Sequence, residues 1–142
     1  MNTNLEKAKE MLILGDYTCV LFNGTQKHYS NQKGVRPLIE FLESNIDFSD
    51  YCAADKVVGA GAAHLYILLK VKSVWANVIS FPAKEIFKSN NIAIFFEAEV
   101  PHIINRSGDG ICPIEECVTG ITDSNAALES IKQRLVELNS SN

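Results

Sequence analysis

The chain has 142 residues, of which 46% are hydrophobic and 21% are charged. This balance is typical of a globular protein and excludes disordered and fibrous classes. The length predicts a single domain, with an ordered core from about residue 5 to residue 138. The formal net charge of -4 argues against a nucleic-acid partner, because phosphate backbones are bound by basic faces.

The cellular setting is predicted from what the sequence lacks. No apolar run reaches the roughly 20 residues that cross a bilayer, and the first residues lack the pattern of a secretory signal. We therefore expect a cytoplasmic protein with no membrane partner, whose cysteines stay as thiols. No CxxC pair occurs, and we assign no histidine to a metal, so we expect no metal and no cofactor. His64 is expected to be a hydrogen-bonded core or interface residue.

The first third of the chain predicts a helix, a hairpin and a second helix. Residues 5–14 carry apolar side chains at helical spacing, and Gly15 follows as a stop signal. Residues 17–30 predict an antiparallel hairpin with a two-residue turn at Asn23-Gly24, and its second strand is expected at a sheet edge. A further helix is expected from residue 37 to about residue 44.

Residues 54–69 are predicted to form a central helix packed against a sheet. Asp55 is a good N-cap residue, and no proline or second cap follows it. Gly59 and Gly61 each cost a helix roughly 1 kcal/mol relative to alanine, which indicates that a backbone or a ligand comes close there. Lys56 in a first helical turn opposes the macrodipole. Together these features indicate a site at the start of this helix.

The second half predicts a parallel strand pair and a terminal helix. Residues 74–80 and 92–96 are continuous apolar strands, and residues 83–89 form a short helix between them. This order is typical of a right-handed parallel crossover. Asp123 or Ser124 is expected to cap a last amphipathic helix.

In addition to this order of elements, the sequence contains three short motifs: Gly34-Val35-Arg36-Pro37, Ala54-Asp55-Lys56-Val57-Val58-Gly59 and Cys112-Pro113-Ile114-Glu115. With them the chain resembles the family called domain of unknown function 1893 over nearly its whole length. The resemblance implies a three-layer α/β/α fold with a mixed sheet, as in cytidine deaminases.

Zinc-dependent deaminases of that fold carry His or Cys followed by Ala-Glu at the start of the central helix, and Pro-Cys-x-x-Cys at the start of the next. Here Ala54-Asp55-Lys56 and Pro82-Ala83-Lys84-Glu85 stand in those places. The ligands for an attacking zinc hydroxide are therefore missing, and the resemblance supplies a fold and a pocket position but no activity.

Three residues are candidates for binding an anion. Lys56 and the free helix amides would hold a phosphate or carboxylate, and Gly59 would give it room. Arg106, in the irregular loop at residues 105–110, is either an anion clamp or a surface side chain.

Three further residues are candidates for chemistry. Cys112 opens a short helical turn, a place that favours the thiolate, and is the candidate nucleophile. Asp55 or Glu115 would transfer a proton. Each also has a purely structural interpretation: Asp55 as a plain cap, Cys112 as an inert buried thiol and Glu115 as a capping carboxylate.

Two functions follow from these patterns. The first is an enzyme or former enzyme that acts, without zinc, on a nucleotide-like or other anionic small molecule. The alternative is a ligand-sensing or protein-interaction domain that kept the fold and lost catalysis. A homo-oligomer is compatible with either, but no apolar stripe fixes its order.

Overall fold

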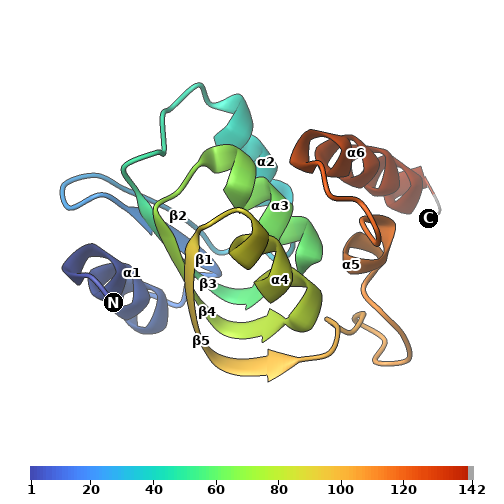
Figure 1. The fold of residues 1–142 in the computed structure, drawn as a ribbon, viewed down its shortest axis with the longest axis horizontal. Coiled ribbons are helices and arrows are strands. Elements are labelled where there is room, and N and C mark those ends of the chain that lie inside the picture. Colours follow the sequence, from blue (N-terminus) through green and yellow to red (C-terminus); the bar gives the residue numbers. More distant parts are fainter. Residues whose placement is uncertain (141–142) are drawn as a thin grey trace.

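The computed structural model describes residues 1–140 of the chain, and Figure 1 shows how its helices and strands are arranged. In chain order the elements are α1 (Thr3–Leu14), β1 (Cys19–Phe22), β2 (Lys27–Ser30), α2 (Arg36–Glu43), β3 (Cys52–Val58), α3 (Ala60–Leu69), β4 (Ser73–Ser80), α4 (Phe81–Ser89), β5 (Ala93–Val100), α5 (Pro113–Cys117) and α6 (Ser124–Ser140).

The centre of the fold is a five-stranded mixed sheet in the order β2-β1-β3-β4-β5. Strand β1 pairs antiparallel with β2 and with β3, whereas β3, β4 and β5 run parallel. The predicted α/β class with a mixed sheet is therefore confirmed, as are the edge position of β2 and the parallel pairing of β4 with β5.

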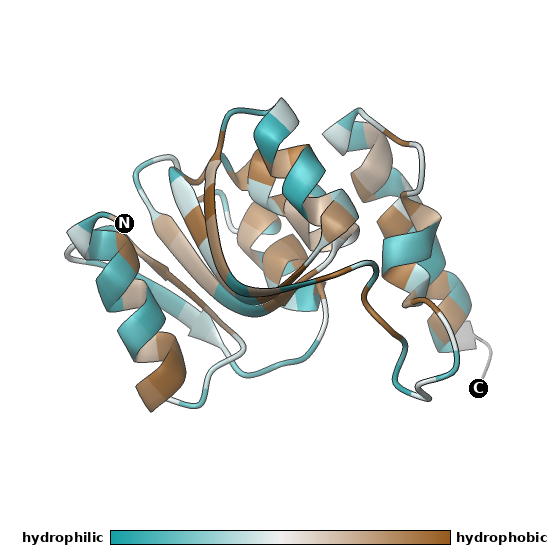
Figure 2. Ribbon diagram, turned by 60° about the horizontal axis from the view of Figure 1, so that its bottom comes forward, coloured by the Kyte–Doolittle hydropathy of each residue, from teal (hydrophilic) through white to brown (hydrophobic). Residues whose placement is uncertain are grey.

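Helices cover both faces of this sheet. Helix α1 lies alone on one face, and α2, α3 and α4 lie on the other (Figures 1 and 2). Helices α5 and α6 pack against the side of α3 that faces away from the sheet. Because α3 has neighbours all round it, most of its residues are buried and it shows no polar stripe. No helix within residues 1–140 is long and apolar enough to span a membrane.

Helix α1 forms as its sequence predicts. Asn2 caps it by accepting the Leu5 N–H at 2.8 Å, and Gly15 ends it. Its buried residues, Leu5, Ala8 and Leu12, recur at helical spacing and pack on the sheet. The helical spacing of the apolar residues thus predicts both the helix and the face that it buries.

The hairpin has a longer connection than predicted. Phe22 pairs with Lys27, so four residues rather than two link the strands. The Asn23 carboxamide oxygen accepts the backbone N–H groups of Thr25 at 3.0 Å and Gln26 at 2.7 Å. An asparagine side chain that holds amides of the loop in this way stabilises a wider turn than the Asn-Gly pair alone requires.

The prediction of one helix over residues 54–69 is wrong in its first part. Residues 52–58 form β3, and α3 begins only at Ala60, with Gly59 as an extended N-cap residue. Ala53 and Ala54 are fully buried, on opposite faces of the strand. A strand covered on both sides carries buried apolar residues on both faces, so their spacing matches neither the helical period nor the strand period. Such spacing does not distinguish a helix from a strand.

Candidate functional site

The carboxyl ends of β3, β4 and β5 meet at one edge of the sheet. Gly59 follows β3, Phe81 follows β4, and His102 comes two residues after β5. Helix α5 packs against α3 beside this edge. Ligands of open α/β sheets bind outside the carboxyl ends of parallel strands, so this edge is the candidate site.

The carboxylate of Glu115 occupies the N-terminus of α3. Its Oε2 accepts a hydrogen bond from the Ala60 N–H, and its Oε1 accepts one from the Ile103 N–H at 3.3 Å. The Glu115 side chain is only 3% exposed. A carboxylate is favourable here because the first helix amides lack partners and carry the positive end of the dipole. The anion expected at the start of the central helix is thus a side chain of the same chain.

Gly59 and Gly61 are explained by the closeness of α5. A Cβ at Gly59 would lie 2.6 Å from Oε2 of Glu115, and one at Gly61 would lie 2.5 Å from Cγ2 of Ile114. Real Cβ atoms do not approach so closely, so any other residue at either position would force a side chain of α5 to move. The close neighbour inferred from the glycines is therefore α5.

His102 stands in front of the buried Glu115 carboxylate. Its Nδ1 lies 4.0 Å from Oε1 of Glu115, and its side chain is 47% exposed. Sequence spacing did not single out this histidine, because the pairing depends on the path of the irregular segment 103–112. The 4.0 Å separation is an ion-pair distance for a protonated imidazole and is too long for a hydrogen bond.

A groove of about 490 Å³ opens beside His102. Phe81 contributes an aromatic side chain that is 48% exposed. Glu99 is paired with Lys84 at 2.6 Å, and the Lys84 ammonium also lies 5.5 Å from the centre of the Phe81 ring. The residues lining the groove are Phe81, Pro82, Glu99, Val100, Pro101 and His102.

Asp55 does not cap a helix but lies buried in the middle of β3. The Tyr66 hydroxyl donates to its Oδ2 at 2.6 Å, and the Val57 N–H donates to its Oδ1 at 3.2 Å. Burial raises the pKa of Asp55 to about 7, although both hydrogen bonds act in the opposite direction. Burial also raises the pKa of Tyr66, and the nearby Asp55 charge adds to this effect.

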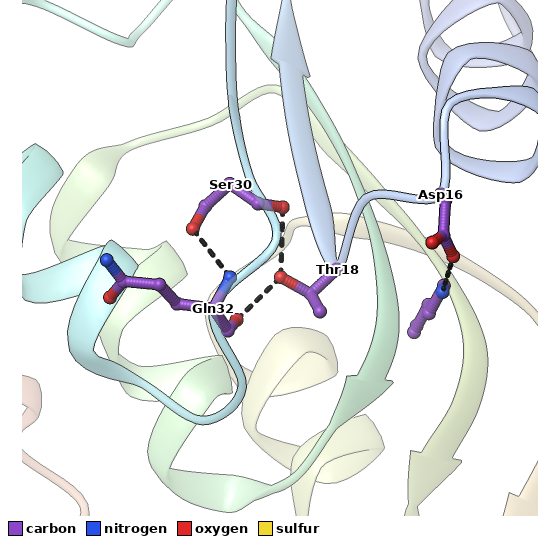
Figure 3. Close-up of polar contacts among 5 residues, drawn as sticks. Asp16, Thr18, Ser30 and Gln32 are labelled. Atoms are coloured by element: carbon purple, nitrogen blue, oxygen red, sulfur yellow. Dashed lines mark hydrogen bonds and ion pairs between the residues drawn. The ribbon is translucent and has the colours of Figure 1, made fainter.

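Lys56 points away from the candidate site. Its ammonium lies 3.4 Å from the Asp16 carboxylate, the contact drawn at Asp16 in Figure 3, and Asp16 follows α1. In the same view the Thr18 hydroxyl lies within hydrogen-bond distance of the Ser30 and Gln32 carbonyl oxygens, which ties β1 to the end of β2. Asp16 follows α1 on one face of the sheet, whereas Cys112 precedes α5, which packs on α3 on the other side, so Lys56 and Cys112 are not brought together.

Cys112 and Arg106 lie beside the site but take no part in the hydrogen bonds of the Glu115 carboxylate. Cys112 immediately precedes α5, its N–H donates to the Ile103 carbonyl at 2.8 Å, and its side chain is partly exposed. Arg106 is exposed in the loop closed by the Ile104–Ile111 bridge. Of the six predicted site residues, the structure thus brings together Gly59 and Glu115, with Cys112 three residues before Glu115.

A histidine and four free cysteines complete the inventory of groups that could carry chemistry. His64 is buried and its Nδ1 lies 2.9 Å from the Ser124 hydroxyl, which confirms the predicted core histidine. Burial lowers its pKa. All four cysteines are free. Within residues 1–140 no three His, Cys, Asp or Glu side chains gather closely enough to hold a metal ion.

Comparison with known proteins identifies the family. The model of the family described as TM1506, domain of unknown function (DUF1893), matches residues 7–135. A crystal structure of a DUF1893 family protein, TM1506 from Thermotoga maritima, is similar with a TM-score of 0.85 and 23% identity, covering 96% of this chain and 92% of that one. No curated protein gives a match. At this identity the structural likeness shows a shared fold, and the match over most of the sequence shows that the chain belongs to the DUF1893 family.

Proposed function

We propose that this chain binds a small, uncharged aromatic molecule of nucleoside size in the groove beside His102, and that His102 exchanges a proton with it. The observation that carries the proposal is the buried Glu115 carboxylate 4.0 Å behind the accessible His102 imidazole. A carboxylate at this distance attracts the imidazolium that proton uptake would form.

The charges around the groove favour an uncharged ligand over the anion expected from the sequence. The carboxylates of Glu99 and Glu115 lie beside it, and Lys84 is already paired with Glu99. The amide at the start of α3 that would have bound a phosphate donates instead to Glu115. The exposed Phe81 ring offers a stacking surface for a flat ligand.

The two ring nitrogens of His102 have separate roles in this proposal. Nδ1 faces Glu115, so Nε2 is left for the ligand. Nε2 accepts a proton from an N–H or O–H group of the ligand, and the Glu115 carboxylate stabilises the imidazolium that forms. The proton returns from Nε2 to the product or to water, which restores the neutral ring.

The second candidate is a binding domain without catalysis, and one observation favours it. The Glu115 carboxylate already accepts two backbone N–H groups, as a purely structural helix cap does. In that case His102 and Phe81 would recognise the ligand, and no proton would move.

Thermal-shift measurements with cytidine, uridine, adenosine and cytidine monophosphate test the proposal. We expect at least one nucleoside to raise the Tm of the wild type and of His28→Gln, a control on β2, but not that of His102→Gln or Phe81→Ala. A screen without any shift would overturn the groove as a nucleoside site. Stronger stabilisation by the monophosphate than by cytidine would overturn the uncharged ligand class.

Mass spectrometry of the stabilising nucleoside then separates the two candidates. Conversion by the wild type that stops in His102→Gln is expected of the enzyme. Binding without any change of mass or retention time over a day is expected of the binding domain.

A further inference from the structure

Strand β5 leaves one edge of the sheet open. It has eight residues and pairs with β4 on one side, and nothing in residues 1–140 pairs with its other side (Figure 1). Its sequence, Ala-Ile-Phe-Phe-Glu-Ala-Glu-Val, contains no proline or lysine, which natural edge strands use to prevent pairing, and its charged residues are Glu97 and Glu99. The opposite edge, β2, is only four residues long and includes Lys27.

Two aromatic side chains lie half-covered along β5. Phe95 and Phe96 are each 38% exposed, and as neighbours in a strand they project from opposite faces of the sheet. An added strand would cover part of both rings in addition to pairing the free backbone groups. The edge therefore offers hydrogen bonds and apolar contact together.

The two acidic residues of β5 are already neutralised within the chain. Lys9 of α1 lies 3.3 Å from Glu97, and Lys84 of α4 lies 2.6 Å from Glu99. Each carboxylate therefore has a cation of the same chain within ion-pair distance. A second acidic strand can therefore approach this edge without bringing an unpaired charge.

We propose that two copies of this chain join through β5, antiparallel about a two-fold axis, to form one continuous sheet. In an antiparallel pair, two residues that lie opposite each other project from the same face of the sheet. The two-fold axis therefore lies between one residue of β5 and the same residue of the second copy. An axis at Glu97 places Glu97 opposite itself, and an axis at Ala98 places Glu97 opposite Glu99. Like charges directly opposite destabilise a strand pair.

An axis at Phe96 avoids both conflicts and keeps most of the strand paired. Phe96 then lies opposite Phe96 of the second copy, Phe95 opposite Glu97, and Ile94 opposite Ala98. An axis at Phe95 also separates the carboxylates but leaves more of the carboxyl end of β5 unpaired. The geometry thus selects one register, and His102 stays outside the paired residues.

Sedimentation velocity over a range of concentrations tests the pairing. We expect a concentration-dependent dimer for the wild type and a monomer for Phe96→Lys, because the substitution sets two ammonium groups face to face. Leu14→Lys, at a side chain 77% exposed at the end of α1, is the matched control and should remain dimeric. Circular dichroism checks that each variant is folded. A wild type that is monomeric throughout, or a Phe96→Lys variant that dimerises as well as wild type, would overturn the proposal.

Disulfide trapping tests the register. Directly opposed residues of an antiparallel pair have Cα atoms about 4.5–5.5 Å apart, within the range of a disulfide. In a Cys112→Ser, Cys117→Ser background, Phe96→Cys should cross-link to its second copy under mild oxidation, and Phe95→Cys should not. Cross-linking of Phe95→Cys alone, or of neither variant, would overturn the register.

Discussion

Asp55 places an ionisable carboxyl group in the middle of the central strand. Its pKa is raised to about 7 by burial, against an ordinary value of 3.8. The folded protein therefore holds a proton that the unfolded chain releases at lower pH. The stabilising contribution is complete below pH 3.8 and decreases as pH rises, until it is lost above about pH 7.

Asp55→Asn should remove this pH dependence. Between pH 4 and pH 8 we expect the unfolding free energy of wild type to fall relative to that of Asp55→Asn, by up to about 4 kcal/mol. Urea unfolding at both pH values measures the difference. Asp16→Asn, whose side chain is 99% exposed, is the control and should follow the wild type. Parallel pH profiles for wild type and Asp55→Asn would contradict a protonated buried carboxyl.

At the scale of single elements, the docking of α5 on α3 depends on Gly61. The position lies in the first turn of α3, where alanine would otherwise be the better helix former. A Cβ there would collide with Cγ2 of Ile114, so the packing contact opposes the helix propensity. The change in stability when Gly61 is substituted shows whether the packing collision or the gain in helix propensity is larger.

We expect Gly61→Ala to destabilise the protein by about 1–3 kcal/mol, because overpacking outweighs the gain in helix propensity. Gly61→Ala combined with Ile114→Ala should cost less than the sum of the two single changes, because the colliding methyl is gone. Gly110→Ala is the control, since a Cβ there meets its nearest atom at an ordinary 3.5 Å. Chemical denaturation measures all four variants, and additive effects would contradict the proposed contact.

Elements with one exposed face were predictable from the sequence, and doubly buried ones were not. Helix α1 has a single apolar stripe, and its limits were found to within two residues. Strand β3 has small buried residues on both faces, and the sequence pattern predicts a helix over its residues 54–58. Whether such residues form a helix or a strand is decided by tertiary packing, here against α1 on one side and α3 on the other.

At the scale of the whole molecule, the sheet separates two apolar cores. The smaller one lies beneath α1 and contains Trp75, the one tryptophan of the chain; its indole lies 4.9 Å from the Lys9 ammonium. The larger one lies between the sheet and the helices of the other face. Both rest on the backbone of β1, β3 and β4, so we expect them to unfold together.

Leu12→Ala tests the coupling of the two cores. Leu12 is 1% exposed, so we expect a loss of about 2–5 kcal/mol, with Trp75 fluorescence and far-UV circular dichroism changing at one denaturant concentration. Leu14→Ala, at an exposed position of the same helix, should change stability by less than about 0.5 kcal/mol. Fluorescence that changes well before the circular dichroism would mean that α1 detaches separately.

The candidate site could be predicted only in part because it is assembled from distant segments. Glu115 was found because a glutamate after Cys112-Pro113 is typical of a short helix start, but its actual partners are the Ala60 amide and His102. Lys56 and Asp55 were grouped with it on the assumption of a helix, and as strand neighbours they project to opposite faces. Local spacing identified the residue types, and the fold determined which of them meet.

The enclosure of α3 also bears on how the protein is made. The outer side of α3 is covered by α6, which is synthesised after the sheet and after α3 itself. A nascent chain that has completed the sheet therefore still presents an apolar helix surface to water until α6 is synthesised. Slowed translation after β5 should prolong that interval and increase the demand for chaperones.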